Sequence, residues 1–366
     1  MAGTDRVQFD PLYVKANDRL ITASIVIVNY NGGDAIMECL NSVLSQLEAG
    51  VEVIVVDNLS VDGSPEAIKV RFPEVQLILA GANRGFGAGN NLGIRNAHGK
   101  YVVFLNPDTL VREGWLAPLI GELEREADVG LVTARILMAD DPATVNTCGN
   151  TVHLTGITLC RGLGLPEDSF NRVEDVGAVS GAAFAMRREL FEELGGFDEE
   201  MFLYMEDTDL SLRVRLSGWR CVLVPASVVL HRYALKMTPM KVFYQERNRY
   251  LMMLKSLRWP TIFVLFPAAV LAELISWVFV ALKDRGNAGN KILAYRWVLA
   301  NRAAIFQKRK EVQSARKISD RRILRTMAVK LDFGQAAPPV IAGVGHVLFD
   351  PIFALIKLLA LAVVWW

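Results

Sequence analysis

Continuous apolar runs that end in polar residues dominate the first third of the chain. The clearest run covers residues 101–105 and leads directly into Asn106, Pro107 and Asp108. Five consecutive apolar residues are typical of a strand that is buried on both faces, as in a parallel sheet. Because Pro107 has no N–H to donate to a neighbouring strand, we expect the strand to end there.

Similar patterns predict three more strands, with a helix after each. In chain order these are strand 24–30, helix 35–47, strand 51–56, a helix opened by 62–65, strand 75–79 and helix 90–96. This alternation predicts an α/β fold with a doubly wound, mostly parallel sheet flanked by helices. The carboxyl ends of such strands share one edge, where ligands bind. The polar residues that we expect at this edge are Asn29, Asn31, Asp57, Asp62, Asn106 and Asp108.

The pattern is less regular after residue 110. It predicts helix 115–127, strand 129–137, strand 178–186, helix 187–194, helix 206–217 and strands 219–224 and 228–231. Residues 138–175 show few signals, and we predict them to be irregular.

Composition points to contact with a membrane. The 366 residues are 52% hydrophobic, with a mean hydropathy of +0.27. Residues 283–330 carry 14 Lys and Arg against 3 Asp and Glu, whereas residues 1–282 carry 25 against 34. A basic block of this kind suits a membrane surface or nucleic acid. Its apolar flanks favour lipid, so we expect no nucleic-acid partner.

Two apolar stretches flank the basic block. Residues 261–282 contain one charge, Glu273, and one proline, while residues 340–366 are apolar with a few polar positions. Length alone would allow the first stretch to span a membrane. A single span would place the basic block outside, against the positive-inside tendency. We therefore predict peripheral or monotopic attachment through 261–366, with spanning helices or the buried hairpin of a soluble homo-oligomer as alternatives.

The four cysteines are scattered without a C-x-x-C pair, which favours a reducing compartment and gives no zinc site. The polar N-terminus gives no sign of a signal peptide.

Several residue groups could carry chemistry, each with an alternative. Asp108 could hold a divalent cation or cap a turn. The cluster at 206–209 could supply a general base, because mutual repulsion raises a carboxyl pKa, or could only favour a helix N-terminus. His231 could complete a metal site or be structural. The glycines at 85–89 do not match a dinucleotide fingerprint, but could let the backbone approach a nucleotide.

Six motifs then occur in an order and spacing that resemble the family 2 inverting glycosyltransferases of the GT-A fold, in the rhamnosyltransferase-like branch. They are 55–64 (VVDNLSVDGS), 83–91 (NRGFGAGNN), 105–108 (LNPD), 195–199 (GGFDE), 204–209 (YMEDTD) and His231. The resemblance covers about residues 22–255. We expect a lead-in at 1–21, a GT-A catalytic domain at 22–255 and a helical, membrane-associated region at 256–366.

The resemblance implies roles for the matching residues. Asp207 would be the catalytic base, with Glu206 alongside, and Asp108 and His231 would bind Mg²⁺ or Mn²⁺. Asn106 replaces the first Asp of the family's D-x-D motif and is a poorer cation ligand. The residues assigned to nucleotide binding are Asn29, Asn31, Asp57, Asp62, Asn83, Gly85, Phe86, Gly87 and Asn106. Those assigned to the donor sugar or acceptor are Ser180, Gly181 and Arg247, although Arg247 could equally lie on a solvated basic helix face.

The implied reaction is transfer of one sugar, with inversion, from a nucleotide-sugar to a lipid-linked or polysaccharide acceptor of the cell envelope. The donor could be dTDP-rhamnose or a UDP-sugar. Since nucleotide-sugars are cytosolic, we expect the cytoplasmic face of the cell membrane. One alternative is a polyprenyl-phosphate hexose synthase, and another is a non-catalytic, membrane-bound nucleotide-binding protein. A processive synthase is disfavoured because the chain lacks a Q-x-x-R-W motif.

Overall fold

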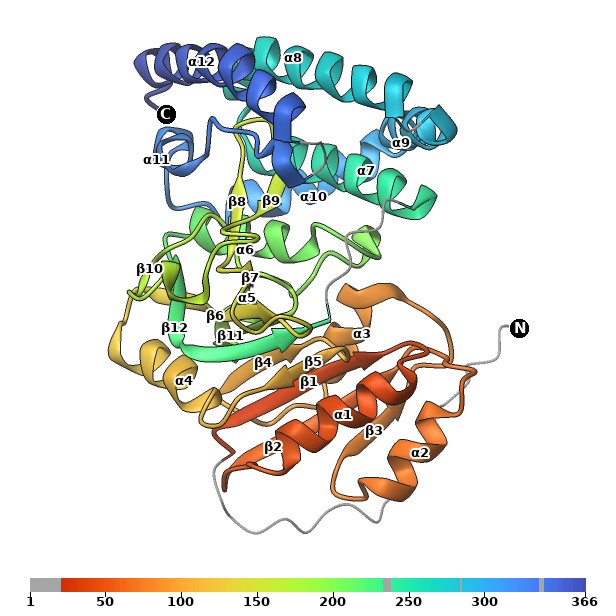
Figure 1. The fold of residues 1–366 in the computed structure, drawn as a ribbon. Helices are drawn as coiled ribbons and strands as arrows, with labels where there is room; N and C mark the ends of the chain where they lie inside the picture. Colours follow the sequence, from red (N-terminus) through yellow and green to blue (C-terminus); the bar gives the residue numbers. More distant parts are fainter. Residues whose placement is uncertain (1–20, 233–237, 284, 336–338) are drawn as a thin grey trace, which may run out of the picture.

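The computed structural model describes residues 21–232, 238–283, 285–335 and 339–366. Within them a ten-stranded sheet has helices on both faces, and a layer of helices covers one end (Figure 1). The strand order is β10-β12-β6-β11-β4-β1-β2-β3, with β5 beside β12 and β7 beside β6. The main strands are β1 (Ala23–Asn29), β2 (Val51–Asp57), β3 (Gln76–Leu79), β4 (Tyr101–Leu105), β5 (Thr109–Val111), β6 (Val129–Met138), β11 (Ala183–Arg187) and β12 (Arg220–His231).

The N-terminal half of the sheet is parallel, as the sequence predicts. β4, β1, β2 and β3 pair in parallel, with Asn29 opposite Asp57 and Ile27 opposite Leu105. Every residue of β1 and β4 is buried, which explains their continuous apolar runs. β11 runs antiparallel between β4 and β6, so the sheet is mixed towards its other end.

Two hydrophobic cores lie on the two faces of the sheet. On one face, α1 (Gly33–Leu44) and α4 (Leu116–Arg125) bury residues such as Ile36 and Leu119 against Ile25. On the other face, α3 (Gly85–Ile94), α5 (Arg188–Glu193) and α6 (Glu206–Leu216) pack around Phe104. The short helix α2 (Ser64–Arg71) follows β2. This three-layer arrangement confirms the predicted α/β class.

The structure differs from the sequence prediction in three places. Residues 138–175 are not irregular. They form the short strands β7 (Val145–Thr147), β8 (Asn150–Val152), β9 (Thr158–Cys160) and β10 (Glu174–Asp175), and the 3-10 helix η1 (Glu167–Ser169). Strands of two or three residues are too short for periodicity to reveal them. The two strands predicted after residue 218 are one strand, β12, with a break in register between Val224 and Val228. The glycine-rich segment begins helix α3 instead of forming a turn before it.

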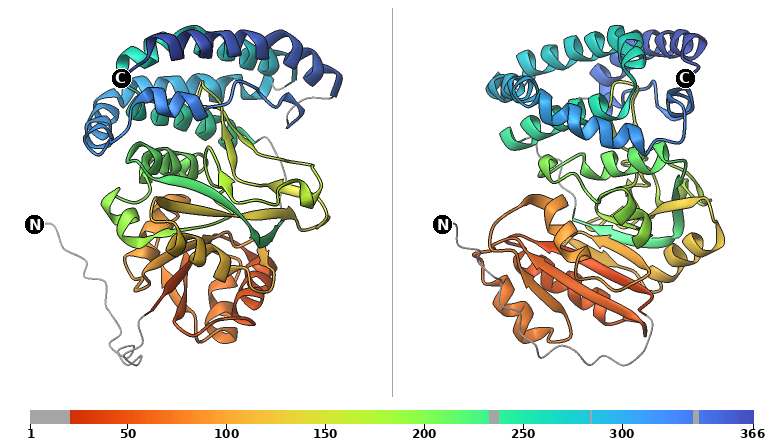
Figure 2. Two further views of the ribbon diagram at one scale, coloured as in Figure 1. Left: turned by 90° about the vertical axis from the view of Figure 1, so that its left-hand side faces the viewer. Right: turned by 180° about the vertical axis from the view of Figure 1, so that it is seen from behind.

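The C-terminal helices form two layers of their own. The layer nearer the sheet contains α7 (Pro239–Ser256), α9 (Ala288–Ala300) and α10 (Arg302–Ser314), with α11 (Asp320–Thr326) beside it. The outer layer contains α8 (Trp259–Lys283) and α12 (Pro339–Val363), which lie side by side (Figure 2). The remaining 3-10 helices are η2 (Glu199–Met201), η3 (Arg285–Asn287) and η4 (Phe333–Gln335).

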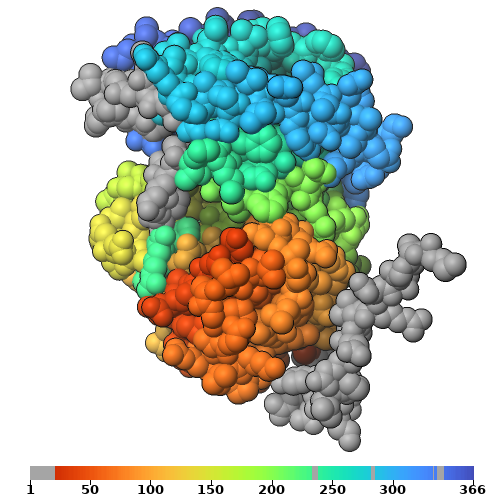
Figure 3. All heavy atoms as spheres, turned by 90° about the vertical axis from the view of Figure 1, so that its right-hand side faces the viewer, coloured from red at the N-terminus to blue at the C-terminus, as the bar shows by residue number. Residues whose placement is uncertain are grey.

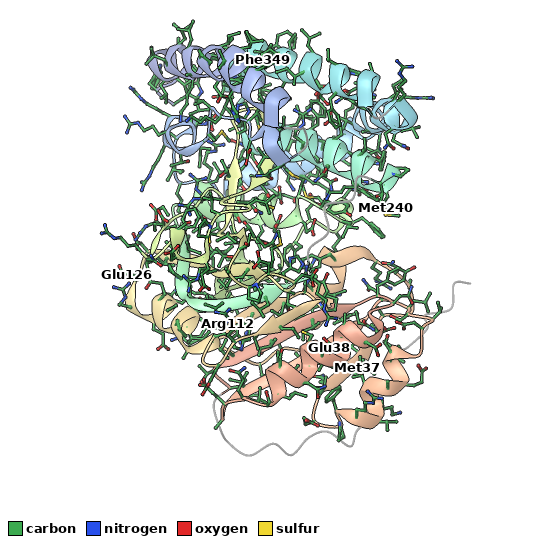
Figure 4. The ribbon with its side chains drawn as sticks, viewed as in Figure 1. Met37, Glu38, Arg112, Glu126, Met240 and Phe349 are labelled. Carbon is green, nitrogen blue, oxygen red and sulfur yellow. The ribbon has the colours of Figure 1, made fainter. Side chains whose placement is uncertain are left out.

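Figure 3 shows these helices, in cyan and blue, stacked on one end of the molecule, with the N-terminal strands and helices, in red and orange, at the other end. A third hydrophobic core joins them to the rest, since Leu212 and Leu216 of α6 pack with Leu251 of α7 and Phe353 of α12. Figure 4 shows side chains filling the space between the layers, with Met37 of α1 and Phe349 of α12 towards opposite ends of the molecule.

Candidate active site

The carboxyl ends of β1 and β2 meet in a buried hydrogen-bond cluster. Asn29 Nδ2 donates to Asp57 Oδ1 at 2.9 Å and to Ser64 Oγ at 2.8 Å. The backbone N–H of Ser60 donates to Asp57 Oδ2 at 3.0 Å. Asn29 and Asp57 are both buried, so these contacts fix the Asp57 carboxylate at the edge of the sheet.

The loops that follow these strands are tied together at the surface. The N–H of Asn31, which has a left-handed φ of 52°, donates to Ser60 Oγ, and its side-chain oxygen accepts from the N–H of Val61. Asp62 Oδ2 accepts from the N–H of Gly33 at 2.8 Å. Asn31 and Asp62 therefore shape the rim beside Asp57.

Asp108 and His231 lie together because the chain turns back after β4. β5 begins one residue after Asp108 and pairs with β12, which sets Thr109 opposite His231. His231 Nε2 is 3.4 Å from Asp108 Oδ1, and His231 Nδ1 is 2.9 Å from Asn146 Oδ1. With Asn146 Oδ1 as the acceptor, Nδ1 is the donor and Nε2 faces Asp108.

This pair fits a divalent cation. Asp108 Oδ1 is buried and accepts no hydrogen bond from the described residues. A carboxylate oxygen and an imidazole lone pair repel each other at this distance unless a proton or a cation lies between them. Within the described ranges no group of three or more His, Cys, Asp or Glu side chains could hold a metal ion. Mg²⁺ and similar ions commonly use one or two protein ligands and take the rest from substrate phosphates and water.

The second carboxylate centre lies at the start of α6. Asp207 Oδ2 accepts from the N–H of Gly181 at 2.8 Å, and Asp207 Oδ1 accepts from the N–H of Thr208 at 2.6 Å. A Cβ on Gly181 would lie 3.4 Å from Asp207 Oδ2, an ordinary van der Waals contact, so space alone does not require glycine here. Ser180, one residue earlier, is buried, and its Oγ accepts weakly from the N–H of Ala182.

Glu206 and Asp207 have unequal surroundings. Burial, reinforced by repulsion from Asp207, raises the pKa of Glu206 to about 8. Glu206 Oε2 is buried without a hydrogen-bond partner among the described residues, which suits a protonated acid. Burial also raises the pKa of Asp207, but the two N–H donors oppose that rise. Asp207 is thus the member of the pair better suited to remain ionised near neutral pH.

Backbone pairing connects the two centres. The N–H of Asn106 donates to the carbonyl of Ala182 at 3.0 Å, and its own carbonyl accepts from Thr109 Oγ1 at 2.7 Å. Since Gly181, which donates to Asp207, adjoins Ala182, the Asp207 carboxylate is linked through these two residues to Asn106, which follows β4 and precedes Asp108 by two residues. β11, whose partner is β4, holds this geometry.

The glycine-rich segment serves packing within the chain. Asn83 Oδ1 accepts from the N–H of Gly85 at 3.0 Å, next to the start of α3. A Cβ on Gly85 would lie 2.1 Å from the carbonyl oxygen of Phe202, and a Cβ on Gly87 would lie 3.0 Å from Phe197 Cβ. The sequence predicts that these glycines let the backbone approach a nucleotide. In the structure, Gly85 and Gly87 instead let the backbone of α3 approach Phe202 and Phe197.

Arg247 lies away from the sheet edge. It is 5% exposed, and its guanidinium donates to the carbonyls of Glu200 and Met201. These contacts give it a structural role in place of the predicted contact with donor or acceptor. Arg247 does not lie on a solvated basic helix face either, because its side chain is buried.

Sequence reasoning missed three asparagines. Asn146 orients His231, Asn150 Nδ2 lies 3.4 Å from Asp207 Oδ2, and Asn248 contacts the segment before α6. The first two belong to short strands in the stretch predicted to be irregular, where no periodicity marks them. Asn248 lies inside a helical pattern, where a buried amide is indistinguishable from an exposed one.

Comparisons with known proteins identify the family of this chain. The family model described as Glycosyl transferase family 2 matches residues 24–195. The N-acetylglucosaminyl-diphospho-decaprenol L-rhamnosyltransferase of Mycobacterium tuberculosis is 31% identical over 234 residues, which cover 57% of this chain and 76% of that protein. The chain belongs to glycosyltransferase family 2. That relative also supports the rhamnosyltransferase-like branch. The O-antigen biosynthesis protein RfbC of Myxococcus xanthus is 29% identical over 57% of this chain and 17% of its own length.

Solved structures show the same fold at low sequence identity. S. aureus TarS 1-349 in complex with UDP-GlcNAc matches 92% of this glycosyltransferase and 90% of its own chain, with a TM-score of 0.53 and 16% identity. GalNAc-T7 with UDP, GalNAc and Mn²⁺ matches 65% of this chain and 48% of its own, with a TM-score of 0.53 and 20% identity. The predicted GT-A fold is therefore confirmed.

Proposed function

We propose that this glycosyltransferase moves one sugar from a nucleotide-sugar to a lipid-linked acceptor, in a single inverting displacement that depends on a divalent cation. The observation that carries the proposal is the approach of His231 Nε2 to Asp108 Oδ1, together with the link from Asp207 through Gly181 and Ala182 to Asn106. The relative from M. tuberculosis is named for a diphospho-decaprenol acceptor and rhamnosyl transfer. By analogy we propose rhamnose as the donor sugar and a polyprenyl-diphospho-sugar as the acceptor.

Each centre has a separate task in this mechanism. Asp57, at the end of β2, binds the nucleobase, with Asn31 and Asp62 at the rim of the pocket. Asp108 and His231 would hold the cation, which would neutralise negative charge on the nucleoside diphosphate. Asp207 accepts the proton of the acceptor hydroxyl as that oxygen attacks the anomeric carbon. Since no side chain bonds to the sugar, one displacement inverts the anomeric centre.

GalNAc-T7, which has the same fold, was solved with Mn²⁺ and UDP, and this supports a cation in the present chain. In the present chain the orphaned Asp108 Oδ1 and the orientation of His231 by Asn146 support the same choice. An outer partner that fixes the tautomer is usual for histidines that bind metals. Mn²⁺ and Mg²⁺ both accept this mixture of carboxylate and imidazole.

The membrane attachment that we propose is monotopic. Two helices, Trp259–Ala281 and Ala342–Val363, are long and apolar enough to span a membrane, and only 17% and 11% of their most apolar windows are buried. The charged groups in them face the protein. Lys291 Nζ lies 2.9 Å from Glu273 Oε2, Arg249 also pairs with Glu273, and Lys357 Nζ donates to the carbonyl of Met327.

The opposite faces of these helices are apolar and uncovered. On α8 the exposed side chains recur at helical spacing, namely Phe263, Phe266, Val270, Leu274 and Val278. On α12 they are Val344, Val347, Leu348, Ile352, Leu355, Leu358, Leu359 and Val363. Because the charged groups of both helices pair with the rest of the protein and their exposed side chains are apolar, we propose that the pair lies in the membrane plane. The pair therefore presents one flat apolar face to the bilayer.

The basic block lies on the helices next to this face. Arg285, Arg296, Arg302 and Lys310 are exposed on or beside α9 and α10. Such residues attract anionic headgroups within a Debye length of the surface. Because nucleotide-sugars are made in the cytosol, we propose the cytoplasmic face as the site of attachment.

A combined binding and transfer experiment tests the function. Nucleoside diphosphates are screened by thermal shift with and without Mn²⁺, and dTDP-L-rhamnose is then offered with N-acetylglucosaminyl-diphospho-polyprenol. We expect Mn²⁺-dependent stabilisation by one nucleotide, and transfer by the natural enzyme. Asp207→Asn should abolish transfer and keep the thermal shift, whereas Val70→Ser, a change at an exposed residue of α2, should keep both. Full transfer by Asp207→Asn would exclude this residue as the base.

A further inference from the structure

The segment that leads into the catalytic helix has an unusual backbone. Three of the four residues between η2 and α6 adopt left-handed conformations, with φ of 60° at Phe202, 67° at Tyr204 and 71° at Met205. Bulky residues without a glycine among them avoid this region because Cβ crowds the carbonyl. Strained segments of this kind persist only where surrounding contacts fix them. We call residues 202–205 the catalytic turn, since Glu206 and Asp207 follow directly.

One buried amide on α7 fixes the turn from the side of the C-terminal helices. Asn248 is fully buried, and its Nδ2 donates to the carbonyls of Met201 at 2.9 Å, Leu203 at 3.1 Å and Tyr204 at 2.7 Å. Its Oδ1 accepts from Arg247 Nε at 2.9 Å. A side-chain amide that meets three carbonyls of one short segment defines the shape of that segment.

Arg247 reinforces the same contact. Its guanidinium donates to the carbonyls of Glu200 and Met201, so Arg247 and Asn248 together reach the carbonyls of four of the five residues from 200 to 204. Tyr244, one helical turn earlier on α7, stacks on Phe202 with ring centroids 5.2 Å apart. The basic side chain that sequence reasoning assigned to substrate is thus part of a support for the catalytic turn.

α3 holds the turn from the opposite side. The N–H of Phe86 donates to the carbonyl of Phe202 at 2.8 Å. A Cβ on Gly85 would lie 2.1 Å from that carbonyl oxygen, so only glycine permits this approach. The turn is therefore held between an N-terminal helix and a C-terminal helix, each through backbone carbonyls.

We propose that Asn248 is a positioning residue for the transfer reaction: by fixing the catalytic turn it sets the place of the Asp207 carboxylate against Gly181. The proposal rests on the assignment of Asp207 as the base. It also makes α7, and with it the C-terminal bundle, part of the catalytic apparatus as well as the support of the membrane face. Arg249, the next residue of α7, pairs with Glu246 and with Glu273 of α8. These ion pairs fix α7 within the C-terminal bundle.

The test compares two isosteric changes in the full-length protein. Asn248→Asp keeps the size of the side chain and removes its N–H donors, so the carbonyls of Leu203 and Tyr204 lose this partner, while the carbonyl of Met201 keeps its bond from Arg247. Asn301→Asp is the matched control, because Asn301 lies in the same bundle and makes only a local bond to the carbonyl of Trp297 among the contacts described. Asn248→Gln keeps the donors at a changed reach and should give an intermediate effect.

We expect Asn248→Asp to lower kcat for rhamnosyl transfer at least a hundredfold, while the KM for dTDP-L-rhamnose changes less than threefold. Hydrogen exchange of peptides covering 201–208 should become faster in this variant and remain unchanged in Asn301→Asp. Gly85→Ala, which acts on the turn from α3, should give the same loss of kcat. A similar loss of kcat in Asn248→Asp and Gly85→Ala would show that kcat depends on the shape of the catalytic turn and not on one side chain alone.

Three results would overturn the proposal. The first is a kcat within twofold of the natural enzyme in Asn248→Asp. The second is unchanged exchange at 201–208. The third is an equal loss of kcat and of Mn²⁺-dependent nucleotide binding, which would indicate general unfolding. The proposed function fails separately, if the natural enzyme does not transfer or if Asp207→Asn transfers normally. Hydrogen exchange at 201–208 shows whether Asn248 fixes the catalytic turn, whether or not the proposed function holds.

Discussion

The apolar face of α8 and α12 gives the sharpest quantitative prediction. Phe263 and Phe266 of α8 are 73% and 62% exposed, so their side chains contribute little to packing within the protein. Changing both to serine should leave the fold intact and weaken attachment to a bilayer. The perturbation therefore separates membrane binding from folding, which deletion of the helices would not do because α8 contacts α9 and α12.

The magnitude follows from the exposed area. A phenylalanine side chain can bury about 200 Å², so the two exposed fractions leave roughly 270 Å² available to lipid. At about 25 cal/mol per Å² this surface is worth about 7 kcal/mol if it enters hydrocarbon completely. Interfacial helices bury only part of such a surface, and half of that value still corresponds to more than a hundredfold in partition.

The assay is co-sedimentation with vesicles of phosphatidylcholine, with and without phosphatidylserine. The control changes Val70 and Leu79 to serine, since these residues are 79% and 67% exposed on α2 and β3, outside the C-terminal bundle. We expect the control to bind like the natural protein and the Phe263/Phe266 variant to remain in solution. Equal binding of both variants, with release by salt alone, would refute an apolar attachment and leave only the basic residues.

Three further predictions concern the site. Asp108→Asn should remove the Mn²⁺-dependent part of the thermal shift by a nucleoside diphosphate, because the cation loses its only carboxylate in the pair; an unchanged shift would place the cation elsewhere. Asn146→Ala should weaken Mn²⁺ binding about 10- to 100-fold by releasing His231, measured by titration calorimetry; normal affinity would show that the histidine is not a ligand. The third prediction concerns Glu206, whose pKa in the folded protein is raised to about 8. Glu206 is protonated when folded and ionised when unfolded between about pH 4.5 and 8, so the free energy of unfolding should fall by about 1.4 kcal/mol per pH unit as pH rises through that window. Glu206→Gln should remove that slope in denaturant titrations, and a slope equal to that of the natural protein would contradict a buried, neutral Glu206.

Local sequence patterns predicted the parallel half of the sheet well. β1, β2 and β4 are buried on both faces, so each appears as a continuous apolar run, and the residue at the end of each run is a polar group at the ligand-binding edge. The same patterns failed for β7 to β10, because two or three residues carry no period. They also failed for the glycines of α3, where the reason for glycine is the carbonyl of Phe202, far along the chain.

By itself the sequence determined the α/β class, the strand ends that carry Asp57 and Asp108, and the order of motifs that indicates the family. These features depend on residues that are close together in the sequence, where burial of one or both faces of an element leaves a regular pattern of apolar residues. Only the tertiary structure decided that His231 faces Asp108, because the pairing of β5 with β12 brings these distant residues together. It likewise decided that Glu273 turns inward and that Asn248 holds the catalytic turn. Which face of a helix is covered, and which buried amide meets which carbonyl, depends on long-range packing that periodicity does not record.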